Sequence, residues 1–285
     1  MECEAKLLRK KNELGRYRQK LREAKEIWEQ LGHEKNATWC QANIEVSLGI
    51  DCFFTKNYGE AIRHFDVSRE LYMKIGDIKA AKFCEAYSKL SEARLLRDRK
   101  DPAKVMELVK SAETAFLEAG AEMEARLCGA DYLCLAGDCK FRDGKFHEAR
   151  EDFLEAAEIS EETGRERQGC YLKGRAAECE YRIAKLGGDI QAIIRALESA
   201  SSFYEKAGAQ EPYFVNMGDL NRFKGLHAKS EGRYGEAIRS FRDARRFYEK
   251  ASRASEQYRS RHKRSAEYMD ALILSTSADY ELVVH

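Results

Sequence analysis

Residues 225–244 read GLHAKSEGRYGEAIRSFRDA and carry the pattern that decides the fold. A small residue is followed by an aromatic residue and then by small, large and small residues, namely Gly225, Tyr234, Ala237, Phe241 and Ala244. The last three lie four and three residues apart, which is the spacing of one face of an α-helix. The segment therefore predicts one helix, a short turn, and a second helix that buries this face.

The same pattern recurs every 44 residues along the chain. The successive units end on a glycine, with a serine in the last place: Gly32, Gly76, Gly120, Gly164, Gly208 and Ser252. Eleven residues before each of these lies a large apolar residue: Leu21, Phe65, Val109, Phe153, Leu197 and Phe241. Such self-similarity indicates stacked helical hairpins, because a single hairpin cannot bury its own apolar face.

Each repeated glycine follows a helical stripe, so we expect it to cap a helix C-terminus with a positive φ. Another helix per repeat is predicted over residues 35–55, 78–98, 122–142, 166–186 and 211–230, and it forms the first helix of each hairpin. Small residues recur within these helices, with one exception at Tyr181: Gly49, Ala93, Gly137 and Gly225. The two prolines, Pro102 and Pro212, fall in first turns of helices, where a missing N–H costs nothing.

This organisation resembles the tetratricopeptide repeat (TPR) family, whose signature pairs a small residue in the first helix with an aromatic, Ala, a large apolar residue and Ala in the second. Two further copies match it with Gly49, Tyr58, Ala61, Phe65 and Ser68, and with Gly137, Phe146, Ala149, Phe153 and Ala156. The period exceeds the usual repeat of the family by about ten residues. Long units with a Gly76-Asp77 turn also look like those of the soluble NSF attachment protein (SNAP) and related adaptors. The chain nevertheless lacks the glycine-and-phenylalanine membrane loop and the acidic, leucine-ended tail of that group.

The resemblance implies an all-α fold. We expect a right-handed α-solenoid (superhelix) of about six TPR-like helical hairpins, forming a single domain over residues 1–285. A capping helix is predicted over about 253–274 and is followed by a tail, residues 275–285, that loses the repeat pattern. The apolar end of this tail would dock on the last hairpin or in the groove of another copy.

Composition narrows the class of protein further. The chain has 50 Lys and Arg residues against 49 Asp and Glu, which argues against a surface devoted wholly to a polyanion. No apolar run approaches the roughly 20 residues that span a bilayer, and the first residues do not look like a signal peptide. Nine cysteines, an odd number spread along a helical chain, suit a reducing compartment. These features predict a cytoplasmic protein with no membrane span.

Residues suited to catalysis or metal binding do not converge in the sequence. Cys128, Cys134 and Cys139, with His147 nearby, could suggest zinc, but the second and third lie five apart on one helix and point in different directions. Cys128 also shares its repeat position with two other cysteines, where a small apolar side chain is needed. Phosphate-binding glycine loops and hydrolase motifs are absent from the sequence. We therefore expect no enzyme, no catalytic residues, no metal and no cofactor.

The TPR resemblance places the first helix of each pair on a concave, ligand-binding face. The candidate groove residues on that face are Asn43, Tyr87, Arg94, Arg97, Asp131, Asp138, Arg175, Glu178, Arg182, Asp219, Arg222 and Lys229. Their chemistry varies from repeat to repeat while the packing positions stay uniform, as expected for a fixed scaffold whose face suits a particular ligand. A solvated helix face is the alternative interpretation. The Lys/Asn clamp that TPR domains use on chaperone carboxy-termini does not occur at matching positions.

Charge is unevenly distributed along the chain. Residues 107–166 hold 16 acidic and 7 basic residues, whereas residues 233–264 hold 11 basic and 4 acidic ones. A candidate basic docking patch near the C-terminal end consists of Arg253, Arg259, Arg261, Lys263 and Arg264. The patch fits a solubilising cap, a surface for an acidic protein partner, or self-association with the acidic middle of another copy. Nucleic acid is a poor fit, because no aromatic stacking module accompanies the charge.

These observations predict a non-catalytic protein–protein interaction scaffold or adaptor that binds a peptide or protein segment in its concave groove. The alternative is a SNAP-like adaptor or activator of a partner ATPase that docks through its basic C-terminal end. A peptide-sensing regulator, like bacterial quorum-sensing TPR proteins, would need an effector domain, and residues 1–31 are too short to hold one. The sequence does not specify the partner.

Overall fold

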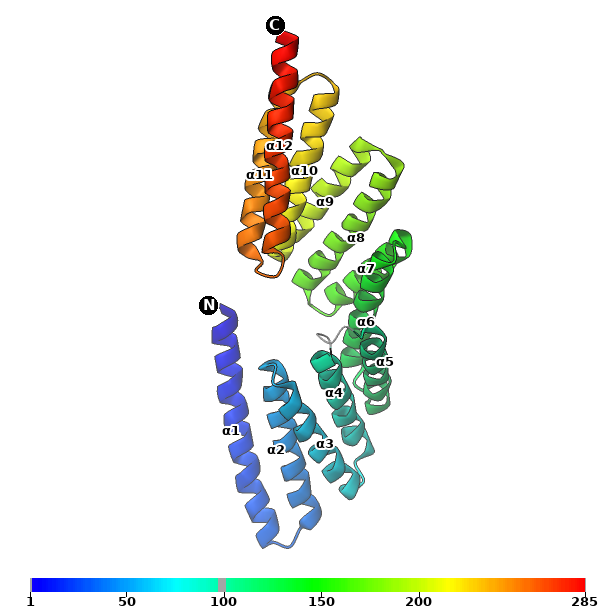
Figure 1. The fold of residues 1–285 in the computed structure, drawn as a ribbon. Helices are drawn as coiled ribbons and strands as arrows, with labels where there is room; N and C mark the ends of the chain where they lie inside the picture. The colour runs from blue at the N-terminus through cyan, green and yellow to red at the C-terminus, as the bar shows by residue number, and fades with distance from the viewer. Residues whose placement is uncertain (1, 97–100, 285) are drawn as a thin grey trace. The chain divides into compact units, whose positions relative to one another are not determined.

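The structure is a computed structural model that describes the backbone of residues 2–96 and 101–284 and the side chains of residues 13–96 and 101–283. This described part contains 12 α-helices and no strand (Figure 1): α1 (Glu2–Gln30), α2 (Glu34–Phe54), α3 (Tyr58–Ile75), α4 (Ile78–Leu96), α5 (Pro102–Ala119), α6 (Glu122–Arg142), α7 (Phe146–Glu162), α8 (Glu166–Gly187), α9 (Ile190–Ala207), α10 (Gln210–Ser230), α11 (Tyr234–Ala254) and α12 (Arg259–Val284). The five predicted first helices, now α2, α4, α6, α8 and α10, start within one residue of their expected positions. The all-helical fold is confirmed.

The chain divides into two compact units, Met1–Tyr132 and Leu133–His285. In the first unit, α1 to α5 pack in order, each helix against the next. In the second unit, α7 to α12 pack in the same consecutive way. The first part of α6 belongs to one unit and its last part to the other. Within each unit the arrangement is therefore solenoid-like, as the repeat predicts.

The repeated glycines end helices as expected. Their φ values lie between 71° and 79° at Gly32, Gly76, Gly120, Gly164 and Gly208. At Gly76 the chain closes the last turn of α3 with two backbone bonds, since Gly76 N–H donates to the Met73 carbonyl and Asp77 N–H to the Tyr72 carbonyl. A side chain at this left-handed position would be strained, so glycine is required by the backbone. Pro102 lies in the first turn of α5 as predicted, and Asp101 caps that helix by accepting a bond from Lys104 N–H.

Within each hairpin, a small residue of the first helix faces a large residue of the second. A methyl group built on Gly225 in α10 would lie 2.5 Å from Cε1 of Phe241 in α11, whose side chain is fully buried. Two other repeats have the same close contact: Gly49 with Phe65 and Gly137 with Phe153. Where the first position is larger, the second is smaller, as in the pairs Ala93 and Val109, and Tyr181 and Leu197. The Gly–Phe and Ala–Val pairs therefore fill similar volumes, whereas Tyr181 and Leu197 together are larger.

The C-terminal helix differs from the prediction. The helix expected over about 253–274 begins at Arg259, because α11 continues to Ala254, and it runs to Val284. The residues expected to form a patternless tail are therefore helical up to Val284. Contacts with the preceding hairpin hold them: Lys229 pairs with Asp279 at 2.8 Å, and the rings of Tyr234 and Tyr280 lie 6.3 Å apart. The expected docking on the last hairpin occurs through a continued helix.

Burial of the cysteines gives a first testable prediction. Burial raises the pKa of the Cys84 thiol to about 11 and that of the Cys179 thiol to about 12. Thiolates are the reactive form, so at about pH 8 these two should react with iodoacetamide at least about 100-fold more slowly than half-buried Cys170. Peptide mass mapping of the native protein measures this, and in urea the three rates should converge. Equal rates in the native protein would contradict the packing described for α4 and α8.

Candidate functional site

In the first unit the predicted groove residues lie on α2, α4 and the first part of α6. Tyr87 stacks on Phe65 with ring centroids 5.1 Å apart and contacts Phe53 and Phe116 edge-on. It therefore belongs to an aromatic cluster with one ring from each of the helices α2, α3, α4 and α5. Asn43 is half-buried and donates to the carbonyl of Trp39 within its own helix.

An ion pair connects the two remaining described groove residues of this unit. Arg94 on α4 binds Asp131 on α6, and both side chains are about 30% exposed or less. The two residues are 37 positions apart, so they come from successive repeats. This contact places the exposed faces of α4 and α6 on the same side of the unit, as the repeat predicts. Arg97 lies outside the described residues.

In the second unit the groove residues form a polar network across three helices. Arg175 on α8 donates to Asp138 on α6 at 2.7 Å and lies 3.1 Å from the carboxylate of Glu178. Asn216 on α10 donates to Glu178 at 3.1 Å. Asp138 and Arg175 are again 37 residues apart, so they repeat the geometry of the Arg94–Asp131 pair with the charges exchanged. Successive first helices are thus linked through the very positions predicted to face a ligand.

Arg175 is held in a mostly enclosed position. Its guanidinium lies over the rings of Phe153 and Phe141, 4.7 Å and 5.3 Å from their centroids. Burial alone would lower the pKa of Arg175, but the carboxylates of Glu178 and Asp138 outweigh that effect and raise it. The residue therefore keeps a permanent positive charge that the protein itself neutralises.

A second polar cluster lies one repeat further along. Asp219 on α10 accepts bonds from Arg222 at 2.9 Å and from the hydroxyl of Tyr248 on α11 at 2.8 Å. Burial, and then the charge of Asp219, raise the pKa of Tyr248 above its ordinary value. The phenol therefore stays protonated and serves as a hydrogen-bond donor. Asp219 and Arg222 are also partnered within the chain.

Among the groove cations of this unit, Arg182 differs because it forms no ion pair with the described side chains. Its guanidinium lies over the rings of Tyr181 and Phe141, 5.3 Å and 5.7 Å from their centroids, and its buried Nε has no hydrogen-bond acceptor. Lys185, one turn further on, is exposed and forms no ion pair with the described side chains. Lys229, in contrast, is used by the ion pair to α12. The end of α8 is therefore the part of this face with charge left for a ligand.

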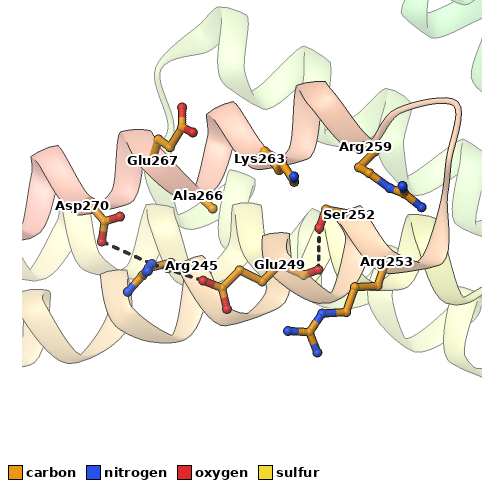
Figure 2. A pocket seen from close by; sticks show the side chains of 9 residues that line it. All are labelled: Arg245, Glu249, Ser252, Arg253, Arg259, Lys263, Ala266, Glu267 and Asp270. Carbon is orange, nitrogen blue, oxygen red and sulfur yellow. Dashed lines mark hydrogen bonds and ion pairs between the residues drawn. The ribbon is translucent and has the colours of Figure 1, made fainter.

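The predicted basic patch has a different character, because its residues stay unpaired. All five of its side chains are exposed, and none forms an ion pair with the described part of the chain. Arg253, Arg259 and Lys263 line a cleft of about 560 Å³ between α11 and α12. Figure 2 shows these three at the end of the cleft near the turn that joins the helices, with Glu267 and Asp270 toward the other end.

An ion pair between α11 and α12 holds the two sides of this cleft together. Arg245 on α11 lies 3.2 Å from Asp270 on α12 and 3.3 Å from Glu249, as the dashed lines in Figure 2 indicate. Next to the cleft, buried His262 contacts Glu211 on α10 at 2.8 Å. These contacts fix α12 on the preceding hairpin. The basic side chains are thus presented from a rigid support.

The sequence prediction of the groove residues missed that many of them pair with each other. The opposite charges 37 residues apart, and the i, i+3 pairs on α8 and α10, were signals that could have revealed this. Within the described residues, no group of three or more His, Cys, Asp or Glu side chains is placed to hold a metal ion. Cys128 is buried, as expected for a packing residue. Among the described helices, none combines the length and apolar character needed to cross a bilayer.

Comparison of the sequence with models of known protein families, and with curated proteins, finds no significant match. The likeness to TPR proteins therefore depends on the residues quoted above.

Proposed function

We propose that this protein is a non-catalytic, TPR-like interaction scaffold that binds a peptide or protein segment on the face formed by its first helices. The class of ligand follows from the chemistry of that face, which offers charged and aromatic groups from successive helices in a fixed order. Such a face suits an extended or helical polypeptide that can contact several repeats at once.

The single observation that carries this proposal is the contrast between the two faces of the hairpins. The large residues of the second helices are buried in every repeat, with Phe65, Phe153 and Phe241 fully enclosed. The first helices instead present half-buried residues whose charge changes from repeat to repeat. Their side chains are held by mutual ion pairs, so little conformational freedom would be lost on binding. An enzyme would require reactive side chains that converge on one site, and we identify no such group among the described residues.

The end of α8 is the proposed anchor for the ligand in the second unit. Arg182 forms no ion pair with the described side chains, and exposed Lys185 lies one turn away. Phe141, half-buried beneath Arg182, supplies apolar surface next to these charges. An acidic group of the ligand beside an apolar side chain fits this arrangement.

The basic C-terminal end supports a second candidate function, that of an adaptor or ATPase activator that docks through this end. The supporting observation is the convergence of Arg253, Arg259 and Lys263 on one cleft without ion-pair partners. An acidic surface loop or helix end of a partner protein fits such a cleft.

One experiment separates the two candidates. The tagged full chain is purified from cells of its source together with its partners, and quantitative mass spectrometry compares wild type with charge-reversed variants. We expect Arg182→Glu/Lys185→Glu to reduce the enrichment of a specific partner at least about tenfold, because reversal repels the acidic group it should bind. Purified partner and variant then give the change in Kd directly.

The matched control for this experiment is Arg195→Glu/Lys206→Glu, which reverses two exposed charges on α9 and should leave enrichment unchanged. Loss of the partner only with Arg259→Glu/Lys263→Glu would favour docking through the C-terminal cleft. A partner set that none of the three variants alters would overturn both proposals.

A further inference from the structure

The outer face of α7 carries an acidic stripe. We use this name for five exposed residues at alternating three- and four-residue spacing, Glu148, Glu151, Glu155, Glu158 and Glu162. This spacing aligns the carboxylates along one side of the helix over about 21 Å. Glu151 and Glu155, at its centre, form no ion pair with any described side chain. The stripe is therefore a row of like charges that the protein does not neutralise at its centre.

The outer face of α11 carries a basic stripe of the same length. It consists of five exposed residues that are again three or four positions apart, Arg239, Arg242, Arg246, Lys250 and Arg253. Arg239 and Arg242 form no ion pair in the described part of the chain, whereas Arg246 lies 3.2 Å from Asp243 within its own helix. Lys250 lies over the rings of Phe214 and Phe247. Two helices of one unit thus carry matched rows of opposite charge.

The second helix between them has no such row. On α9 the exposed face holds Arg195, Glu198, Glu205 and Lys206, and Glu198 is already paired with Lys224 on α10. A single-sign face is therefore not a general property of the second helices. Within the described part of the second unit, it occurs on α7 and α11 and not on α9.

We infer that the acidic stripe on α7 of one copy binds the basic stripe on α11 of a second copy. The two rows share their length, their helical pitch and their number of charges, and their signs are opposite. No described ion pair joins the two stripes within one chain. Glu151 and Glu155 of the first, and Arg239 and Arg242 of the second, are the charges that remain available to another molecule. Because each copy presents one acidic and one basic stripe at different places, the contact is heterologous and leaves one stripe of each kind free for a further copy.

Salt dependence follows from the chemistry of this contact. The charges lie at the ends of long, exposed side chains, and every residue of the two stripes is charged. Interactions of this kind are screened over about 10 Å at 0.1 M salt and over about 3 Å at 1 M. Association should therefore be concentration-dependent in dilute salt and lost in concentrated salt. This inference does not depend on the proposed ligand-binding face, since α7 and α11 are second helices.

Sedimentation velocity of the full chain tests the inference. Over a concentration series at about 0.05 M salt, the mass of wild type should rise above the monomer mass of 32.7 kDa, and at about 0.5 M salt it should return to that mass. The variants Glu151→Lys/Glu155→Lys and Arg239→Glu/Arg242→Glu should each stay monomeric in dilute salt. An equimolar mixture of the two variants should associate, because the first keeps the unaltered basic stripe on α11 and the second keeps the unaltered acidic stripe on α7.

Circular dichroism checks that both variants fold, and Arg195→Glu/Glu205→Lys on α9 serves as a control that should associate like wild type. A wild type that stays monomeric at every concentration in dilute salt would overturn the inference. So would association that persists in both stripe variants, or failure of the folded variants to associate when mixed. Arg253 and the α12 patch are unchanged in these variants, so the result is independent of docking through the α11–α12 cleft.

Discussion

Alanine in place of Phe241 is expected to lower the free energy of unfolding by about 3–5 kcal/mol. The phenyl ring is fully buried and lies in a cluster with Ala228 of α10 and Met269 of α12, so its removal leaves a cavity shared by three helices. The surrounding backbone is helical on all sides and can collapse only partly into that space. Urea unfolding followed by circular dichroism measures the change.

The control for this prediction is Phe54→Ala, which removes the same side chain from an exposed position at the end of α2. That change should alter stability by no more than about 0.5 kcal/mol. Because stacked repeats can unfold in stages, the transition of the second unit should be followed separately with a probe on α11. Similar effects of both substitutions would contradict the packing described for α10, α11 and α12.

The second prediction concerns the small partner of the same contact. Gly225→Ala would ordinarily stabilise a helix by about 0.5–1 kcal/mol. Here the added methyl group would lie 2.5 Å from Cε1 of Phe241, so we expect a net destabilisation of about 1–3 kcal/mol. The same urea experiment measures it.

A compensating change provides the decisive comparison for Gly225→Ala. Adding Phe241→Val recreates the Ala93 and Val109 combination found three hairpins earlier, and should recover a large part of the loss that Phe241→Val causes alone. Gly235→Ala is the matched control, because a Cβ at this exposed site in the first turn of α11 would meet nothing within 4 Å. A Gly225→Ala variant as stable as the Gly235→Ala variant would contradict the claim that the contact with Phe241 leaves no room for a side chain at position 225.

The sequence predicts the repeated parts of this fold well because their causes are local. Gly76 ends a helix through its own backbone conformation, and Phe153 is buried because it recurs on one face of an amphipathic helix. Such features depend on neighbours along the chain. The repeat then places equivalent residues on one side without any knowledge of contacts between hairpins.

Features that depend on tertiary contacts could not be predicted in the same way. Thr276 is fully buried in α12 although its surroundings in the sequence lack the repeat pattern, since packing on the last hairpin, not local preference, extends that helix. The pairing of Arg175 with Asp138 depends on the distance between two first helices, which the repeat spacing alone does not give. The sequence therefore indicated the candidate groove residues, but not that many of them neutralise one another.

The matched glycine and aromatic residues have a consequence for how such a chain can grow or shrink. Gly225 and Phe241 belong to one hairpin, so a duplicated or deleted 44-residue segment carries both members of the steric fit with it. The Arg175–Asp138 ion pair instead joins neighbouring hairpins. Insertion of a copied segment would therefore preserve the interior of every hairpin and disrupt the charge matching at its borders, so new copies could diverge first at the surface that meets other molecules.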